Sequence, residues 1–315
     1  MAWSEDSIHR WLGKRARPVA MVGALGHDGA ILKARGERPV LCVDACIEGV
    51  HFEKGAPKKS VGEKAAGRSL SDLAACAAVP RGLLLALRAP ERAMEKDLKA
   101  LIQAVDRFGT RFGAPLVGGD LSAAPGPMSL TVSALGGLPG RRKPVARSRG
   151  KAGQVLLLTG SVGGSRLGRH LRIAPRLEVA RFLFEAGATA MMDISDGLAL
   201  DLSRLARASQ VRAELEQIPI HRDALRQARL SGKDPLEHAL LDGEDHELLV
   251  SMKPAAWNAI ATKAKKRYPG LQPIGRFTRG QGLGLEECLQ GLGRPVSLPR
   301  HWAKLGWLHG SRARR

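Results

Sequence analysis

The sequence has few aromatic residues and no long apolar run. Its 315 residues include six Phe, five Trp and one Tyr, so few rings are available to stack on nucleic-acid bases. No apolar stretch approaches the length of a membrane-spanning helix, and the N-terminus lacks the apolar core of a signal peptide. We therefore expect a cytoplasmic protein that does not span a membrane.

Cysteine is also scarce. The four cysteines, Cys42, Cys46, Cys76 and Cys288, form no C-x-x-C pair. Without that spacing, or a matching histidine pattern, a structural zinc site is not expected. We predict free thiols that are mostly buried.

Acidic residues are outnumbered by basic ones. There are 30 Asp and Glu against 50 Lys and Arg, which gives a formal net charge of +20. A basic excess can neutralise nucleic-acid phosphates, but the clustering is modest and is densest at "RRKPVARSRGK", residues 141–151. We therefore favour a basic surface that attracts small anionic substrates over a nucleic-acid-binding protein.

Strand-like and helix-like segments alternate along the chain. Apolar runs bounded by Gly and Pro predict strands at residues 39–52, 114–121, 128–138, 154–160 and 188–195. Apolar residues at three- and four-residue spacing predict helices at 62–78, 91–109 and 196–209. The alternation predicts an α/β or α+β fold. The polar segment 139–153 indicates a domain junction, so we expect domains at 1–139 and 150–315.

Several acids are surrounded mainly by Gly, Ala, Leu and Val rather than by basic residues. They are Asp28, Asp44, Asp72, Asp120, Asp193, Asp196, Glu244 and Asp245. Ser195 or Asp196 is placed to cap the helix predicted to follow it. Asp193 has no such explanation, because it lies inside an apolar strand, and burial of an unpaired carboxylate is costly.

Acids that converge need a counter-ion. Mg²⁺ is the natural one, because it binds carboxylate oxygens together with substrate phosphates, and such a site is typical of phosphoryl transfer. The sequence has no P-loop, no G-x-G-x-x-G after a strand and no protein-kinase motif set. The glycine-rich run at 159–171 fits neither glycine fingerprint and predicts a tight strand-to-helix turn. A nucleotide would therefore be held by dispersed carboxylates.

Taken together, eight motifs resemble the thiamine-monophosphate kinases, whose superfamily also contains aminoimidazole ribonucleotide synthetase, selenophosphate synthetase and a hydrogenase maturation protein. In chain order the motifs are "GHDGAIL", "VDACIEGVHF", "SLSDLAACAA", "VGGDLS", "ARSRG", "HLRIAPR", "MDISDGLALDLSRL" and "DGEDHEL". No reactive cysteine precedes Cys42, which disfavours the selenophosphate branch.

The resemblance implies a fold and an activity. The fold is that of aminoimidazole ribonucleotide synthetase: an N-terminal domain whose sheet pairs across a homodimer, and a C-terminal α/β domain, with ATP bound between the two. The activity is direct transfer of the γ-phosphate of ATP to thiamine monophosphate, which gives thiamine diphosphate. No covalent nucleophile is needed, because the acceptor phosphate already carries an anionic oxygen.

The resemblance also implies residue roles. The implied Mg²⁺ ligands are Asp28, Asp44, Asp72, Asp120, Asp193 and Asp196. The implied ATP contacts are Gly119, Asp120, Arg147 and Ser195, and the implied thiamine contacts are His51, Glu244 and Trp307. His51 is equally compatible with an ordinary interior histidine, and Arg147 with solvated surface. Arg172 and Arg176 are open to a phosphate-facing or a structural role.

Six positions depart from the family pattern. They are His27, Cys42, Val43, Leu121, His246 and Gly310. Cys42 and Val43 replace small hydroxyl residues, and His246 replaces a tyrosine. Three alternatives to the family activity therefore stay open: weaker metal affinity, a different small phosphorylated acceptor, and a nucleotide-binding protein without turnover.

Overall fold

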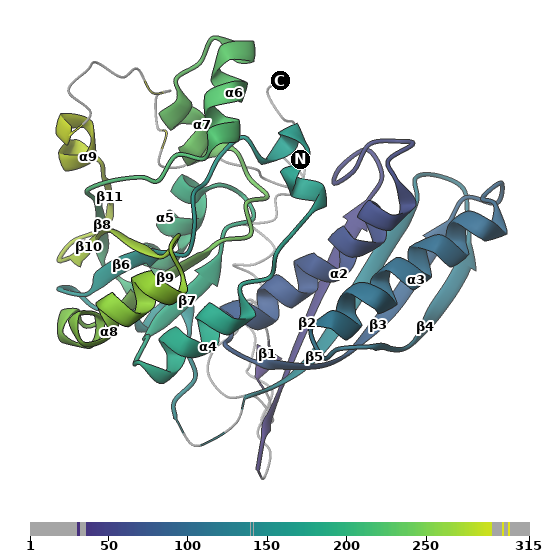
Figure 1. Ribbon diagram of the computed structural model, residues 1–315, viewed down its shortest axis with the longest axis horizontal. Coiled ribbons are helices and arrows are strands. Elements are labelled where there is room, and N and C mark those ends of the chain that lie inside the picture. The colour runs from purple at the N-terminus through teal and green to yellow at the C-terminus, as the bar shows by residue number, and fades with distance from the viewer. Residues whose placement is uncertain are drawn as a thin grey trace, which may run out of the picture.

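The computed structural model describes residues 30–31, 36–138, 140, 142–291, 298 and 302. It contains two sheets, each with its own helices, that lie side by side in an elongated molecule (Figure 1). The predictions for His27, Asp28, Trp307 and Gly310 fall outside the described residues.

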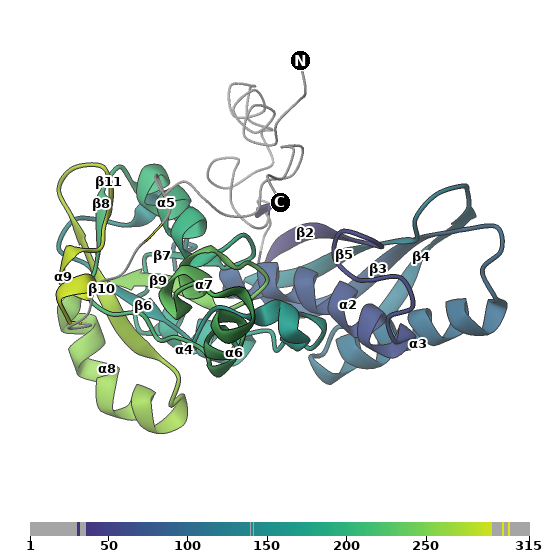
Figure 2. The same cartoon turned by 90° about the horizontal axis from the view of Figure 1, so that it is seen from above.

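The N-terminal sheet has the strand order β1-β2-β5-β3-β4. Its strands are β1 (Ala30–Ile31), β2 (Arg38–Ile47), β3 (Val79–Ala89), β4 (Leu116–Ala123) and β5 (Ser129–Leu138). The pairs are antiparallel except for β3 with β4. Helices α2 (Lys58–Ala75) and α3 (Glu95–Arg111) cover one face of this sheet, and no described element covers the other (Figure 2).

Helix α2 is the central element of the fold. It packs against α3 and the N-terminal sheet, and it also contacts α4 (Leu177–Glu185) and β7 (Ala190–Asp193) of the C-terminal half. Small residues make this possible, because a Cβ on Gly62 would lie 2.6 Å from the carbonyl oxygen of Leu101 in α3. Close packing on several sides leaves α2 buried along most of its length.

The C-terminal sheet has the order β11-β8-β10-β6-β9-β7. Its remaining strands are β6 (Val155–Leu158), β8 (Arg212–Leu215), β9 (Leu248–Met252), β10 (Gln272–Thr278) and β11 (Gly282–Gly284). Its remaining helices are α5 (Leu198–Ser209), α6 (Arg222–Ser231), α7 (Pro235–Leu241), α8 (Pro254–Arg267) and α9 (Glu286–Gly291). Three short 3₁₀ turns complete the description: η1 (Arg147–Arg149), η2 (Ser165–Leu167) and η3 (Arg169–Leu171).

The elements predicted from the sequence are confirmed, with shifted ends. The strand predicted at 39–52 ends at Ile47, and the one predicted at 188–195 covers Ala190–Asp193. Strand β3 was not predicted, because Pro80 and Gly82 interrupt its apolar pattern where its register with β5 shifts. Strand β5 ends at Leu138 and β6 begins at Val155, so the last strand of the N-terminal sheet and the first strand of the C-terminal sheet flank residues 139–154.

The cysteine prediction is confirmed, because all four thiols are free and buried. A search of the described residues finds no helix with the length and apolar character that crossing a bilayer requires.

We predict that Gly62→Ala destabilises the protein. Ala is ordinarily the better helix former by about 1 kcal/mol, but here its methyl group would collide with the backbone of α3. Overpacking of this kind costs about 1–3 kcal/mol, so the free energy of unfolding in urea should fall. Lys59→Ala, at an exposed position of the same helix, is the control. If Gly62→Ala and Lys59→Ala had the same free energy of unfolding, the close packing of Gly62 against α3 would be contradicted.

Candidate active site

Helix α2 carries a polar stripe at the contact between the two halves of the chain. Lys64, Arg68 and Asp72 follow one another at four-residue spacing, which places them on one face of the helix. Lys64 is fully buried and Arg68 nearly so. Lysine and arginine are rarely buried without a partner, so their partners define the contact.

The partners are carboxylates from both halves. Lys64 Nζ donates to Glu244 Oε2 at 2.6 Å and to the His51 carbonyl oxygen at 2.5 Å. Arg68 donates to Glu244 Oε1 at 3.2 Å and to Asp44 Oδ1 at 2.9 Å. Burial by itself would raise the pKa of Glu244, but Lys64 and Arg68 together lower it below its ordinary value. This network brings His51 and Glu244 together, as the sequence-based assignment requires.

These contacts correct one expectation from the sequence. The acids were expected to lack basic partners, yet four of them are paired. Asp44 and Glu244 pair with α2, Asp196 pairs with Arg204 of α5, and Asp245 pairs with Arg169 of η3. The expectation failed for Asp44, Glu244 and Asp245 because their bases come from elements distant in sequence. It failed for Asp196 because Arg204, eight residues further on, reaches it from α5.

Asp193, at the end of β7, differs from these paired acids. Its side chain is buried, and its Oδ2 accepts a hydrogen bond from the Ser71 hydroxyl at 2.7 Å. His246 Nδ1 lies 3.3 Å from the same oxygen. Among the described residues no Lys or Arg forms an ion pair with Asp193. Asp193 is therefore a buried carboxylate with no lysine or arginine partner in the described part of the chain, as its sequence neighbours indicate.

The loop 242–247 approaches this carboxylate in a restricted conformation. Glu244 and His246 have positive φ angles of 62° and 51°, a region that side chains other than Gly seldom adopt. Within the described residues His246 Nε2 is buried without a hydrogen-bond partner. Backbone strain and an unsatisfied polar atom often mark functional sites.

The start of α5 corrects a second expectation. Neither Ser195 nor Asp196 caps the helix, because the N-cap residue is Gly197, at a φ of 114°. Instead Asp201, in the first turn, accepts the backbone N–H groups of Ser195 and Asp196 at 3.0 and 2.9 Å. Burial, reinforced by the neighbouring Asp196 carboxylate, raises the pKa of Asp201. Asp201 and Arg204 thus fix the turn that follows Asp193.

Asp44 and Asp72 both lie close to the Cys42 thiol. Burial raises the pKa of this thiol, and the two carboxylates raise it further. Cys42 donates a hydrogen bond to the Ser69 carbonyl oxygen at 3.1 Å. Asp44 and Asp72 therefore belong to the same neighbourhood of β2 and α2.

Two groups of predicted residues lie elsewhere in this chain. Gly119 and Asp120 are on β4, three strand positions from β2, or about 14 Å at normal strand spacing. Asp120 is in register with the exposed Ala86 and so lies on the uncovered face of the sheet. Asp44 is in register with the buried Val132 and so lies on the face that α2 and α3 cover. The Arg147 carbonyl oxygen accepts a hydrogen bond from the Ser209 hydroxyl. Ser209 ends α5, so this contact lies at the opposite end of the helix from Asp196.

The donor set is suited to Mg²⁺ but is incomplete within the described part of the chain. Carboxylate oxygens are the ligands this ion prefers, and no Lys or Arg that the structure describes pairs with Asp193. No group of three or more Asp, Glu, His or Cys side chains among the described residues is arranged to hold a metal. The predicted ligand Asp28 lies outside them, and Asp120 lies on the other face of the sheet.

Comparison with known proteins identifies the family of this chain. The profiles "AIR synthase related protein, N-terminal domain" and "AIR synthase related protein, C-terminal domain" match residues 26–138 and 158–287. A thiamine-monophosphate kinase from Rhodopirellula baltica is 36% identical over 263 residues, which cover 79% of this chain and 82% of the relative. The chain belongs to the thiamine-monophosphate kinase family.

Solved structures agree with this assignment. "AaThiL complexed with AMPPCP and TMP" matches with a TM-score of 0.82 and 25% identity, covering 97% of each chain. The thiamine-monophosphate kinase of Stenotrophomonas maltophilia matches with a TM-score of 0.71 and 29% identity, covering 90% of this chain and 97% of that one. The expected family fold is thereby confirmed.

Lys64 and Arg68 were missed by the sequence analysis. The signal was present, because two bases four residues apart stand among Ala, Gly and Leu in "EKAAGRSLSDLAA". A charged pair on a helix that is otherwise buried needs acidic partners from elsewhere in the fold. The same reasoning that singled out the acids would have identified these bases.

We predict that Lys64→Met destabilises the protein by about 3 kcal/mol, because removal of one member of a buried pair leaves the other charge uncompensated. Glu244→Gln in the same chain should recover part of the loss, since it removes that charge. Denaturant unfolding of the two single variants and the double variant measures the coupling. Lys99→Met, which breaks the exposed Lys99–Glu95 pair, should cost less than about 0.5 kcal/mol. Similar losses for Lys64→Met and Lys99→Met would contradict the role of the buried network.

Proposed function

We propose that this protein transfers the γ-phosphate of ATP to thiamine monophosphate and so makes thiamine diphosphate. The observation that carries the proposal is that acids from both halves of the chain meet beside α2. One of them is the buried Asp193, which has no lysine or arginine partner among the described residues. The similar proteins are thiamine-monophosphate kinases, and one was solved with AMPPCP and TMP.

The chain's own residues would mainly position the substrates. The Lys64–Arg68 network holds the Glu244 carboxylate and the His51 backbone in place, where we propose that they contact the thiamine substrate. We propose Ser195, Gly119, Asp120 and Arg147 as ATP contacts and Trp307 as a further thiamine contact. Preorganised contacts suit this reaction, because the phosphate acceptor needs no covalent activation by the enzyme.

We further propose that Asp28, Asp44, Asp72, Asp120, Asp193 and Asp196 hold Mg²⁺ ions. When bound, the ions would neutralise charge on the transferred phosphate. Asp44 and Asp196 are already paired with arginines, so their carboxylates are positioned before a metal arrives. Ser71 and His246 would orient Asp193 in the same way.

We propose that the protein is a homodimer in which the two copies contact each other through the uncovered face of the N-terminal sheet. This face carries exposed apolar side chains at Leu41, Val43, Leu84, Val117 and Leu135, and large exposed apolar patches mark interaction sites. Asp120 lies on the same face. In such a dimer Asp120 would lie at the interface between the two copies.

The remaining assignments are consistent with this function. We propose that residues 1–139 form the nucleotide-binding and dimerisation domain and that residues 150–315 complete the substrate cleft. Four free thiols fit a reducing compartment, and we propose the cytoplasm.

The activity is tested by identifying the product. Wild-type protein with Mg-ATP and thiamine monophosphate should give thiamine diphosphate and ADP. Asp193→Asn should lower kcat/KM about 1,000-fold, or about 4 kcal/mol, while the fold is kept. Asp97→Asn, at a surface acid in α3, should change nothing. ADP release with another phosphorylated acceptor but not with thiamine monophosphate would favour the alternative acceptor. ATP binding without ADP release would favour a nucleotide-binding protein without turnover.

The dimer is tested by placing a charge on the sheet. Val43→Glu puts a carboxylate on the apolar face, where its desolvation would oppose association. Sedimentation should show a dimer for the wild type and a monomer for the variant. Leu230→Glu, at an exposed leucine of α6, is the matched control and should remain dimeric. A wild-type monomer at micromolar concentration would overturn this proposal.

A further inference from the structure

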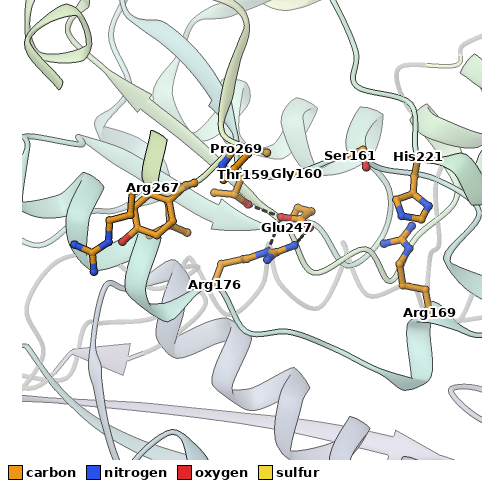
Figure 3. A pocket seen from close by; sticks show the side chains of 12 residues that line it. Thr159, Gly160, Ser161, Arg169, Arg176, His221, Glu247, Arg267 and Pro269 are labelled. Atoms are coloured by element: carbon orange, nitrogen blue, oxygen red, sulfur yellow. Dashed lines mark hydrogen bonds and ion pairs between the residues drawn. The ribbon is translucent and has the colours of Figure 1, made fainter. Parts of the chain in front are cut away.

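A polar cavity of about 470 Å³ lies in the C-terminal half. Its walls include Thr159 and Ser161 after β6, Arg169 and Arg176, and His221 before α6 (Figure 3). A volume of this size suits a small molecule. None of the described residues proposed above for ATP, thiamine or Mg²⁺ lines it.

The cavity and the candidate active site lie on opposite sides of the loop 242–247. Glu244 and His246 contact α2 and Asp193. The alternate residues, Asp245 and Glu247, contact Arg169 and Arg176 instead. One loop therefore supplies acids to two separate environments.

Arg176 lines the cavity and forms an ion pair with Glu247. Its Nε donates to Glu247 Oε2 at 2.8 Å, and its Nη2 pairs with Glu247 Oε1. Glu247 is fixed in turn by the Thr159 hydroxyl at 2.6 Å. Arg176 Nη1 forms no hydrogen bond within the described residues. The guanidinium group is thus rigid, with one nitrogen left for a ligand.

Arg169 and His221 present similar donors from the other side. Arg169 uses Nη2 for Asp245 Oδ1 at 2.7 Å and for the Gly163 carbonyl oxygen at 2.9 Å, which leaves Nη1 without a hydrogen bond among the described residues. His221 Nδ1 accepts the N–H of Asp223 at 3.0 Å. Because Nδ1 acts as an acceptor, the neutral His221 ring carries its proton on Nε2, and Nε2 is therefore a hydrogen-bond donor.

The donors surround one space. Figure 3 shows the Arg176–Glu247 pair on one side of a gap and Arg169 with His221 on the other, with Ser161 above the gap. Guanidinium groups bind phosphate oxygens well. A phosphate group has more acceptor oxygens than a carboxylate and arranges them tetrahedrally, so it can accept hydrogen bonds from donors on several sides of this space. We propose that this cavity binds the phosphate group of a small phosphorylated molecule, separately from the catalytic substrates.

Binding of labelled inorganic phosphate to the full-length protein tests the proposal. Equilibrium dialysis in EDTA, without nucleotide or divalent cation, should show one saturable site per chain. Ser161→Asp puts a negative charge beside the gap and should weaken binding at least about tenfold, because like charges in contact cost several kcal/mol. Ser161→Asn, of similar size but neutral, should stay within about threefold of wild type, a difference of less than about 1 kcal/mol.

Two further variants locate the binding. Arg267→Gln should leave the affinity unchanged, because Arg267 lines the cavity but its guanidinium points away from the gap (Figure 3). His221→Asn keeps a good helix cap and removes the ring, so it should weaken binding even if Ser161→Asp fails to fold.

Two results would overturn the proposal: no saturable binding by the wild type, or equal binding by the Asp and Asn variants at position 161. Because the assay contains no ATP, thiamine or metal, its outcome is independent of the kinase activity.

Discussion

The ion network of Lys64, Arg68, Glu244 and Asp44 is the constraint on which the arrangement of the two halves depends. Lys64 has no exposed surface, and its ammonium group is paired with a carboxylate from the other half of the chain. Buried charges of this kind are tolerated only with partners in good geometry. A shift of the C-terminal half relative to α2 would leave these charges without partners. The network therefore selects one relative orientation more than it contributes net stability.

Much of the fold could be predicted from the sequence, because apolar periodicity reports directly on strands and helices. The strand at β7 and the helix at α5 were visible in this way. The strand β3 was not, since its Pro and Gly are read locally as a turn while the sheet accommodates them at a register shift. The cap of α5 was also misassigned, because Gly197 and the reach of Asp201 depend on packing that a local pattern does not contain.

The candidate site was predictable to the extent that it rests on unusual residues in apolar surroundings. Asp193 could be singled out because its neighbours in sequence offer no base, and the structure provides none among the described residues. The same reasoning failed for Asp44 and Glu244, whose bases are supplied by α2. Sequence proximity identifies a buried acid, but only the three-dimensional fold shows whether it is already neutralised.

This distinction gives Asp193 its particular place in the site. Its side-chain partners among the described residues are Ser71 from the N-terminal half and His246 from the C-terminal half, and none of those residues is a lysine or arginine paired with it. A cation that binds there would relieve an electrostatic cost that the folded chain otherwise bears. Because any ligand that binds only the folded state stabilises it, such a cation would also hold Ser71 and His246 together. Metal binding and the packing of the two halves would then be one coupled equilibrium, with the carboxylate of Asp193 as the shared element.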